Sequence, residues 1–298
     1  MAGNTFYLKI IAANRVFYAG RCRSLIVPEY DGQKEILAHH EDMVIAIDEG
    51  EMRFQPEGTA NWEYAVVGMG FVEIVNNRVT LLVETAEHPE EIDVARAREA
   101  KERADTRAIL LEINKAAAQY YYIQLKSSRG AVGLEYFKKR KLSDETIKAF
   151  GLGYSNKYSD DLYRYLKSKG YKDDMIAKAG LISIDEKNGE YDKFWNRVMF
   201  PIMDVNSRVI GFGGRVMGDA KPKYLNSPET MIFDKSRNLY GLNRARRTKK
   251  PYFLLCEGYM DVISLHQAGF TNAVASLGTA LTPGHAALIH RYVQEVYL

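Results

Sequence analysis

The sequence predicts a multidomain chain. An N-terminal all-β sandwich plus a helix is followed by an α+β part that ends in a small α/β sheet. Three observations predict this fold class. Short alternating apolar runs fill residues 6–84, strand and helix patterns alternate over residues 251–298, and the charge changes sign along the chain. Residues 1–104 carry 11 Lys and Arg against 18 Asp and Glu, whereas residues 105–298 carry 30 against 20. This asymmetry indicates two parts with different partners, and the basic part could bind a polyanion. The alternative is that each part is an ordinary soluble domain with its own charge.

Composition excludes several classes of protein. The 298 residues suffice for about two domains, and 46% of them are hydrophobic. No apolar run approaches the ~18 residues of a membrane span, and the N-terminus lacks the pattern of a secretory signal. Cys22 and Cys256 lie far apart, which argues against a disulfide scaffold and against a cysteine zinc site. We therefore expect a cytoplasmic protein without zinc.

The first part contains strand patterns at close intervals, separated by turn signals such as Glu49-Gly50. The strands are expected at residues 6–11, 16–18, 24–27, 35–38, 43–47, 52–55, 64–67, 71–75 and 79–83. Many short strands at regular spacing predict a β-sandwich or a flattened barrel. Residues 90–104, which follow Pro89 and are rich in Ala, Glu and Arg, predict a helix.

Residues 1–104 resemble the epsilon subunit of bacterial F-type ATP synthase. The resemblance rests on residues 24–28 (SLIVP), 38–45 (AHHEDMVI), 65–68 (AVVG) and 77–83 (NRVTLLV). It implies a ten-stranded sandwich that docks on the rotor stalk against the gamma and catalytic subunits, followed by a two-helix hairpin that restrains ATP hydrolysis. A role in proton-driven ATP synthesis and a peripheral position at the inner face of the cell membrane would follow. Residues 92–97 (IDVARA) are similar to an ATP-binding segment of some members, which makes Asp93 and Arg96 possible ATP contacts; ordinary surface charges on a helix are the alternative.

The epsilon resemblance ends after Ala104, where a second helical pattern begins. Apolar residues from Ile109 to Leu125 recur with a spacing close to 3.6, and neither Pro nor Gly separates them from the preceding helix. One continuous helix across the junction is therefore expected. We place the sandwich at residues 1–86 and the junction helix or helices at residues 87–127.

Residues 128–250 predict an α+β subdomain. Helices are expected over 130–150, 160–169 and 173–179, and strands over 197–203 and 209–216. Gly211, Gly213 and Gly214 would let a backbone approach a phosphate, although a bulge or a tight turn explains them equally well. Cations and aromatic residues recur in the 40 or so residues from Arg197 on, a mixture that suits phosphate contacts with base stacking.

Residues 251–298 predict a small, mostly parallel α/β sheet. Strands are expected at 251–256, 272–276 and from Val296, with helices from Met260 and over 283–293. Glu257 follows the first strand, and Asp261 lies in the first turn of the next helix. A carboxylate at this edge of a sheet is a common metal ligand; a helix-capping or surface acid is the alternative.

Residues 105–298 resemble the RNA-polymerase core of bacterial replicative DNA primase. The resemblance rests on residues 197–202 (RVMFPI), 211–215 (GFGGR), 223–230 (KYLNSPET), 257–262 (EGYMDV) and 275–280 (ASLGTA), the last two belonging to a TOPRIM subdomain. It implies metal-dependent nucleotidyl transfer that makes RNA primers for DNA replication, with single-stranded DNA and nucleoside triphosphates as partners. Glu257 and Asp261 would be catalytic and hold Mg²⁺ or Mn²⁺. Template or nucleotide would be bound by Arg140, Arg197, Arg215, Lys223, Tyr224 and Lys235.

Departures from the primase pattern lead to further expectations. The family's Asp-x-Asp motif follows the strand that begins at Val296, so the TOPRIM subdomain is expected to be truncated and its metal site weak. The zinc-binding domain and the helicase-contact region are also expected to be absent, and polymerisation to be poor. The hypotheses are a primase core fused to an epsilon-like domain, an ATP synthase epsilon subunit with a foreign C-terminal extension, and an accidental joining of two genes.

Overall fold

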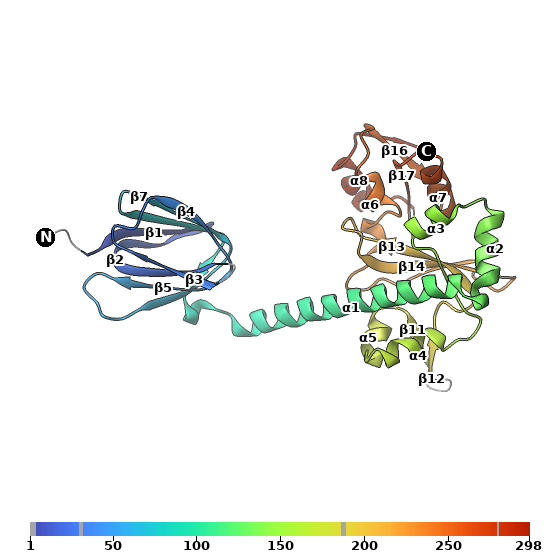
Figure 1. The fold of residues 1–298 in the computed structure, drawn as a ribbon, viewed down its shortest axis with the longest axis horizontal. Coiled ribbons are helices and arrows are strands. Elements are labelled where there is room, and N and C mark those ends of the chain that lie inside the picture. Colours follow the sequence, from blue (N-terminus) through green and yellow to red (C-terminus); the bar gives the residue numbers. More distant parts are fainter. Residues whose placement is uncertain (1–3, 30–31, 186–188, 279) are drawn as a thin grey trace. The chain divides into compact units, whose positions relative to one another are not determined.

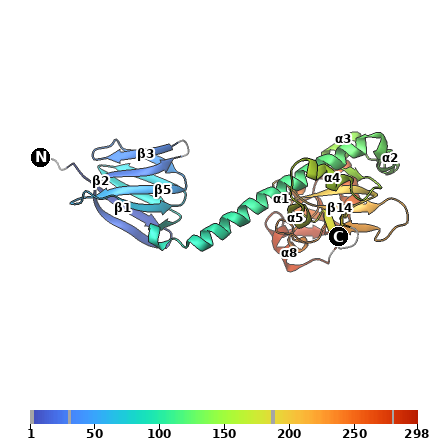
Figure 2. The same ribbon diagram turned by 90° about the horizontal axis from the view of Figure 1, so that it is seen from below.

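The computed structural model describes residues 4–29, 32–185, 189–278 and 280–298, except for the side chain of Asp185. The chain forms two compact units, Met1–Ala100 and Lys101–Leu298 (Figures 1 and 2). Helix α1, Val94–Lys126, contains the boundary between them and continues through Ala104 without a break. This continuity confirms the expectation drawn from the absence of Pro and Gly. Among the described residues no helix is long and apolar enough to cross a membrane.

The first unit is a β-sandwich whose strands pair in the order β4-β7-β8-β1-β2-β5-β6-β9, with β3 paired to β2. Alternate residues point into the core, as Phe6, Leu8 and Ile10 of β1 do, each at most 1% exposed. The strands are β1 Phe6–Ala12, β2 Arg15–Glu29, β3 Gly32–Leu37, β4 Met43–Ile47, β5 Gly50–Pro56, β6 Glu63–Val67, β7 Gly70–Val75, β8 Arg78–Val83 and β9 Ala86–Glu87. The sandwich confirms the predicted fold of this part.

Two details of the first unit differ from expectation. The patterns at 16–18 and 24–27 belong to the single long strand β2, and the short strand β9 was not predicted. The described residues of the first unit therefore form nine strands, whereas the epsilon resemblance implies ten. The expected helix start at residue 90 is a 3₁₀ turn, η1, Pro89–Glu91, and α1 begins only at Val94. Glu91 explains the difference, because its carboxylate accepts hydrogen bonds from the His88 N–H and from Arg15 on β2.

The second unit is built on an antiparallel sheet, β10-β13-β14-β15, against which the C-terminal half of α1 packs. The ring of Tyr121 on α1 meets Phe212 on β14 edge to face, with centroids 5.4 Å apart. The strands are β10 Gly153–Ser155, β13 Arg197–Met203, β14 Val209–Val216 and β15 Tyr224–Asn226; a separate hairpin is formed by β11 Ile182–Asp185 and β12 Gly189–Asp192. The helices are η2 Ser128–Gly130, α2 Ala131–Lys139, α3 Asp144–Ala149, α4 Asp161–Ser168 and α5 Asp173–Lys178. The expected helix over 130–150 is thus two helices, and β10, β15 and the hairpin were not predicted.

A three-stranded parallel sheet in the order β17-β16-β18 completes the second unit, as predicted. Its elements are β16 Tyr252–Cys256, β17 Ala273–Ala275 and β18 Glu295–Tyr297, with η3 Lys235–Arg237, α6 Leu242–Ala245, α7 Tyr259–Gln267 and α8 Pro283–His290. The ring of Tyr259 stacks on Phe200 of β13 at 5.0 Å and meets Tyr240 at 4.7 Å. One hydrophobic core therefore crosses the expected subdomain boundary at residue 250.

Asp192 makes the stability of this unit depend on pH. Its side chain is 1% exposed, and its carboxylate accepts the N–H groups of Leu162 and Tyr163, at 2.8 and 2.9 Å, at the start of α4. Burial raises the pKa of Asp192 to about 6, against the opposing effect of these hydrogen bonds. The folded protein therefore holds this proton more tightly than the unfolded chain does. The stability that protonation contributes is full below the ordinary pKa of 3.8 and is lost as the pH rises through 6.

We expect the free energy of unfolding contributed by this group to fall by up to about 3 kcal/mol between pH 4 and pH 7. Urea denaturation at several pH values, compared between the native chain and Asp192→Asn, measures the effect. The difference in the free energy of unfolding between the native chain and Asp192→Asn should change between pH 4 and pH 7. A difference that stays constant from pH 4 to pH 7 would contradict the assignment.

Candidate nucleic-acid and metal site

Arginine and tyrosine side chains gather where α2 meets β14 and β15. Arg215 on β14 lies opposite Tyr224 on β15 in the antiparallel register. The Arg215 guanidinium is 4.7 Å from the centroid of the Tyr136 ring on α2, and that of Arg140 is 5.4 Å from the same ring. Burial and nearby Tyr224 raise the pKa of Tyr136, while the two arginines lower it. The structure thus brings together the predicted Arg140, Arg215 and Tyr224 around Tyr136, which was not predicted.

This arginine–tyrosine cluster is positively charged and partly open to solvent, since Arg215 and Tyr136 are half-buried and Arg215 Nη1 donates to the Val216 carbonyl. Tyr224 is 44% exposed, and Arg140 and Lys223 are exposed as well. Within the described ranges none of Arg140, Arg215 and Lys223 forms an ion pair with a carboxylate. Unneutralised cations beside an exposed aromatic ring suit a nucleic-acid strand, with phosphates on the cations and a base on the ring.

Two other predicted contacts have different surroundings. Arg197 is only 6% exposed, and its Nη1 donates to the carbonyls of Gly214 and Pro222 at 3.1 and 3.0 Å. Its guanidinium therefore fixes backbone, and the structure does not present it to a nucleic acid. Lys235 is half-buried in η3, and its carbonyl accepts the Nε2–H of buried His285 at 2.8 Å. The first turn of α8 thus positions the backbone that carries Lys235.

The glycines of β14 make room for side chains rather than for a phosphate. A Cβ on Gly213 would lie 2.4 Å from the ring of Tyr259, and one on Gly214 would lie 2.9 Å from Arg197. A Cβ on Gly211 would lie 3.2 Å from Phe233. All three glycines are buried in β14, and Gly211 lies beside a register shift of the β13–β14 pairing. The expected approach of backbone to phosphate is therefore wrong, and close packing across the sheet is the reason for the glycines.

Glu257 and Asp261 occupy the predicted edge of the parallel sheet. Glu257 directly follows β16, Asp261 lies in the first turn of α7, and both are exposed. A Cβ on the intervening Gly258 would lie 3.8 Å from Asp261 Oδ2, so this carboxylate reaches back toward the end of the strand. The part of the chain that the structure describes contains no group of three metal-ligating side chains. Two carboxylates fit Mg²⁺ that takes its other ligands from water and phosphate, but not an all-protein cage.

Asn226 connects the cationic strand to the acidic edge, and sequence reasoning missed it. Its Oδ1 accepts the hydroxyl of Tyr259 at 2.6 Å, and its Nδ2 donates to the Leu277 carbonyl at 2.8 Å. Tyr259 lies two residues after Glu257, and Leu277 follows β17. Because β15 also carries Tyr224, this one short strand joins the arginine–tyrosine cluster to the carboxylate edge. Asn226 lies within residues 223–230, one of the segments that carry the primase resemblance, and this was the signal that could have pointed to it. Thr279, in the segment 275–280, lies outside the described residues.

The possible ATP contacts in the first unit are joined by a local hydrogen bond. Asp93 Oδ1 accepts the N–H of Arg96 at 3.0 Å, which is the geometry of a helix N-cap. Both residues are exposed. The capping bond accounts for Asp93 without a nucleotide, in line with the alternative of ordinary charges on a helix.

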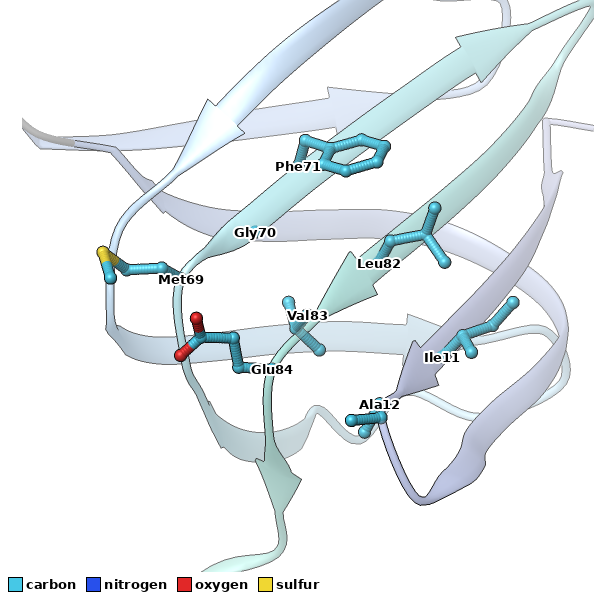
Figure 3. Close-up of a pocket in the computed structure, with 9 residues that line it drawn as sticks. Ile11, Ala12, Met69, Gly70, Phe71, Leu82, Val83 and Glu84 are labelled. Carbon is cyan, nitrogen blue, oxygen red and sulfur yellow. The ribbon is translucent and has the colours of Figure 1, made fainter. Parts of the chain in front are cut away.

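The first unit has an apolar groove of about 530 Å³. Figure 3 shows the side chains of Phe71, Leu82 and Ile11 on neighbouring strands, with Met69 and Glu84 at one end. Phe71 is 45% exposed and Met69 is 54% exposed. An open apolar face of this kind on a sandwich is typical of a protein-binding surface.

Comparison with known proteins divides the chain in the same way. Residues 5–89 match the family model of the ATP synthase Delta/Epsilon chain β-sandwich domain, residues 120–246 that of the DNA primase catalytic core N-terminal domain, and residues 254–298 a Toprim-like family. The chain joins an epsilon-like sandwich to a primase-like core. The two resemblances found in the sequence are thereby confirmed, and so is the multidomain fold class.

Relatives of the primase-like core are numerous. DNA primase of Clostridium acetobutylicum is 48% identical over 190 residues, which is 63% of this chain and 31% of the relative. DNA primase of Deinococcus radiodurans is 49% identical over 185 residues, 61% of this chain and 32% of the relative. The chain thus spans about a third of the length of these curated relatives.

Solved primase structures have the same fold as the core. A structure of the DnaG primase catalytic domain bound to single-stranded DNA is 40% identical, covers 65% of this chain and 63% of its own, and has a TM-score of 0.60. The zinc-binding and RNA polymerase domains of the Aquifex aeolicus primase are 26% identical, with a TM-score of 0.59 over 87% of this chain and 67% of theirs.

Proposed function

We propose that the primase-like core binds single-stranded DNA and nucleoside triphosphates for RNA primer synthesis, a nucleotidyl transfer that depends on a divalent metal. The observation that carries this proposal is the pair of hydrogen bonds made by Asn226, which join β15 to Tyr259 and Leu277 at the sheet edge that carries Glu257 and Asp261. The similarity to a primase catalytic domain bound to single-stranded DNA supports the same function.

The chain's own residues would do three things in this reaction. Lys223 and Arg215 attract the phosphates of the template, and Tyr224 offers a ring on which a base stacks. Asn226 holds the turn after β17 and the start of α7 in one position. Glu257 and Asp261 would hold Mg²⁺ or Mn²⁺, which when bound supplies charge neutralisation at the triphosphate.

A direct test is the binding of a labelled 20-nucleotide oligo(dT) to the purified 298-residue chain, followed by fluorescence anisotropy from 50 to 200 mM NaCl. We expect affinity to fall as salt rises, because cations that contact phosphates release counterions. Affinity that does not change with salt, or an absence of binding at 50 mM, would refute the proposal.

The two carboxylates set the expected strength of metal binding and of catalysis. Because the described residues place only Glu257 and Asp261 at this edge, we propose weak metal binding and poor polymerisation by this chain. Glu257→Gln with Asp261→Asn should lower the affinity for Mn²⁺, measured by electron paramagnetic resonance, at least about tenfold. The control is Asp173→Asn with Asp174→Asn, which removes the same two charges from the first turn of α5. Equal loss in both double variants would contradict the assignment of the metal to Glu257 and Asp261.

The apolar groove favours a second function for the sandwich. We propose that it docks on ATP synthase through this groove, against the gamma and catalytic subunits, as an epsilon subunit with a foreign C-terminal extension. A peripheral position at the inner membrane face, otherwise in the cytoplasm, and a part in proton-driven ATP synthesis go with this proposal. Phe71→Asp should abolish binding to purified ATP synthase depleted of its own epsilon subunit. The exposed Tyr64→Asp, on β6 and outside the groove, is the control. Binding that survives Phe71→Asp would refute the docking surface.

A further inference from the structure

A polar cavity of about 540 Å³ opens at the other edge of the parallel sheet. Its walls come from the turn between β13 and β14, from α6 and the residues after it, and from the end of α7. Thr271 in the wall precedes β17, whereas Glu257 follows β16, and the two strands are parallel. The cavity therefore lies at the amino ends of the strands, opposite the carboxylates. Helix α7 begins beside Glu257 and reaches the cavity with His266.

The cavity is positively charged and lacks a neutralising partner. Residues 244–250 (RARRTKK) contain five cations and no acid. Within the described ranges neither Arg244 nor Arg247 forms an ion pair. Burial, and to a smaller extent nearby Arg247, lower the pKa of Arg244, while Tyr240 has the opposite effect. Two guanidinium groups that share a cavity without a carboxylate favour an anionic ligand.

The orientation of Arg244 is fixed in advance. Its guanidinium lies 4.6 Å from the centroid of the Phe150 ring and donates to the Ala149 carbonyl. Neutral polar groups complete the walls. Asn243 donates to the Ser207 hydroxyl at 3.2 Å, and the Nε2–H of His266 donates to the Ala273 carbonyl at 2.9 Å. An arginine held in this way loses little freedom when it binds an anion.

Further cations follow Arg247 in the sequence, and Phe270 directly precedes Thr271 of the cavity wall. Lys249 and Lys250 are exposed, and the Lys250 ammonium lies 5.2 Å from the centroid of the Phe270 ring, which is 44% exposed. Several cations together with an exposed aromatic ring match a phosphate backbone with a stacked base better than they match an isolated anion.

We infer that Arg244 and Arg247 bind backbone phosphates of a single-stranded nucleic acid at a second site, continued by Lys250 and Phe270. This site is separate from the arginine–tyrosine cluster and goes beyond the proposed function. It would give the strand a second contact on the face opposite Glu257, and so raise affinity without touching the acidic edge.

The test is Arg247→Glu with Lys250→Glu, two exposed positions, in the full 298-residue chain. The control is Lys169→Glu with Lys172→Glu, which makes the same charge change at exposed positions outside the cavity. Anisotropy with labelled oligo(dT) from 50 to 200 mM NaCl should show about tenfold weaker binding for the first variant. Its salt slope should be smaller by about 1.4, which corresponds to two single-strand phosphate contacts. Affinity and slope equal to those of the control would overturn the inference.

A second arm separates a nucleic-acid strand from a free nucleotide as the source of the phosphate. If labelled ATP loses binding in Arg247→Glu/Lys250→Glu while oligo(dT) does not, the strand assignment is overturned. Failure of the inferred second site can be told apart from failure of the proposed function. Loss of oligo(dT) binding on substitution of Lys223 and Tyr224, but not of Arg247 and Lys250, overturns this inference alone. Loss of oligo(dT) binding on substitution of Arg247 and Lys250, but not of Lys223 and Tyr224, supports the second site and refutes DNA binding by the arginine–tyrosine cluster.

Discussion

Gly213→Ala should lower the free energy of unfolding of the primase-like core by about 2–3 kcal/mol. The new Cβ would lie 2.4–2.6 Å from the Tyr259 ring, and that ring is held on its other sides. It stacks on Phe200, meets Tyr240 and donates its hydroxyl to Asn226. Because Tyr259 has little room to retreat, β14 or α7 must shift. Urea denaturation followed by far-ultraviolet circular dichroism measures the loss.

A double-mutant cycle tests whether the clash is with Tyr259. In the background of Tyr259→Leu, whose side chain lacks the ring and hydroxyl, Gly213→Ala should cost less than it does in the native chain, by at least about 1 kcal/mol. Equal costs in the two backgrounds would show that the glycine is required for another reason. The result also bears on function, because a displaced α7 moves Asp261 and loosens the hydrogen bonds of Asn226.

Lys223→Ala with Tyr224→Ala should weaken the binding of single-stranded DNA by roughly 10- to 100-fold at 50 mM NaCl. The first change removes a phosphate contact, and the second removes a ring on which a base stacks. Both side chains are exposed, so the fold is expected to survive. Anisotropy with labelled oligo(dT), at several salt concentrations, measures the change.

The chain contains a matched control for this variant. Lys157 and Tyr158 form another exposed Lys-Tyr pair, with the ammonium 5.4 Å from the ring centroid. They lie in the segment between β10 and α4, away from the cluster in sequence. Lys157→Ala with Tyr158→Ala should leave binding within about twofold of the native chain. Equal weakening by the two double variants would mean that binding follows overall charge rather than the cluster.

Much of the fold was predictable because its signals are local. Alternation marks the sandwich strands, and the uninterrupted run across Ala104 marks α1. The start of α1 was less predictable, because it depends on Glu91 meeting Arg15, which is 76 residues away in sequence. Strands β10 and β15, of three residues each, are too short for a periodic pattern and exist through pairing with β13 and β14.

The candidate site was predictable in its residues but not in their roles. Charge and residue type singled out Arg215 and Tyr224, which the structure places opposite each other on β14 and β15. They gave the same predicted role to Arg197, which is buried against carbonyls. The glycines of β14 were assigned to a ligand because their neighbours in space, Tyr259 among them, lie far away in sequence. Tyr136 and Asn226 carry no charge, and only the folded structure shows what they connect.

The most direct test of the central claim, that one surface of the primase-like core joins DNA-binding cations to a metal-binding edge, is site mapping by photocrosslinking. Oligo(dT) that contains 4-thiothymidine is irradiated with the native 298-residue chain, and crosslinked peptides are identified by mass spectrometry. We predict crosslinks to peptides that contain Tyr136 and Tyr224, lost in Lys223→Ala/Tyr224→Ala and retained in Lys157→Ala/Tyr158→Ala. Crosslinks confined to residues 4–100, or spread over the core without those two peptides, would contradict the account.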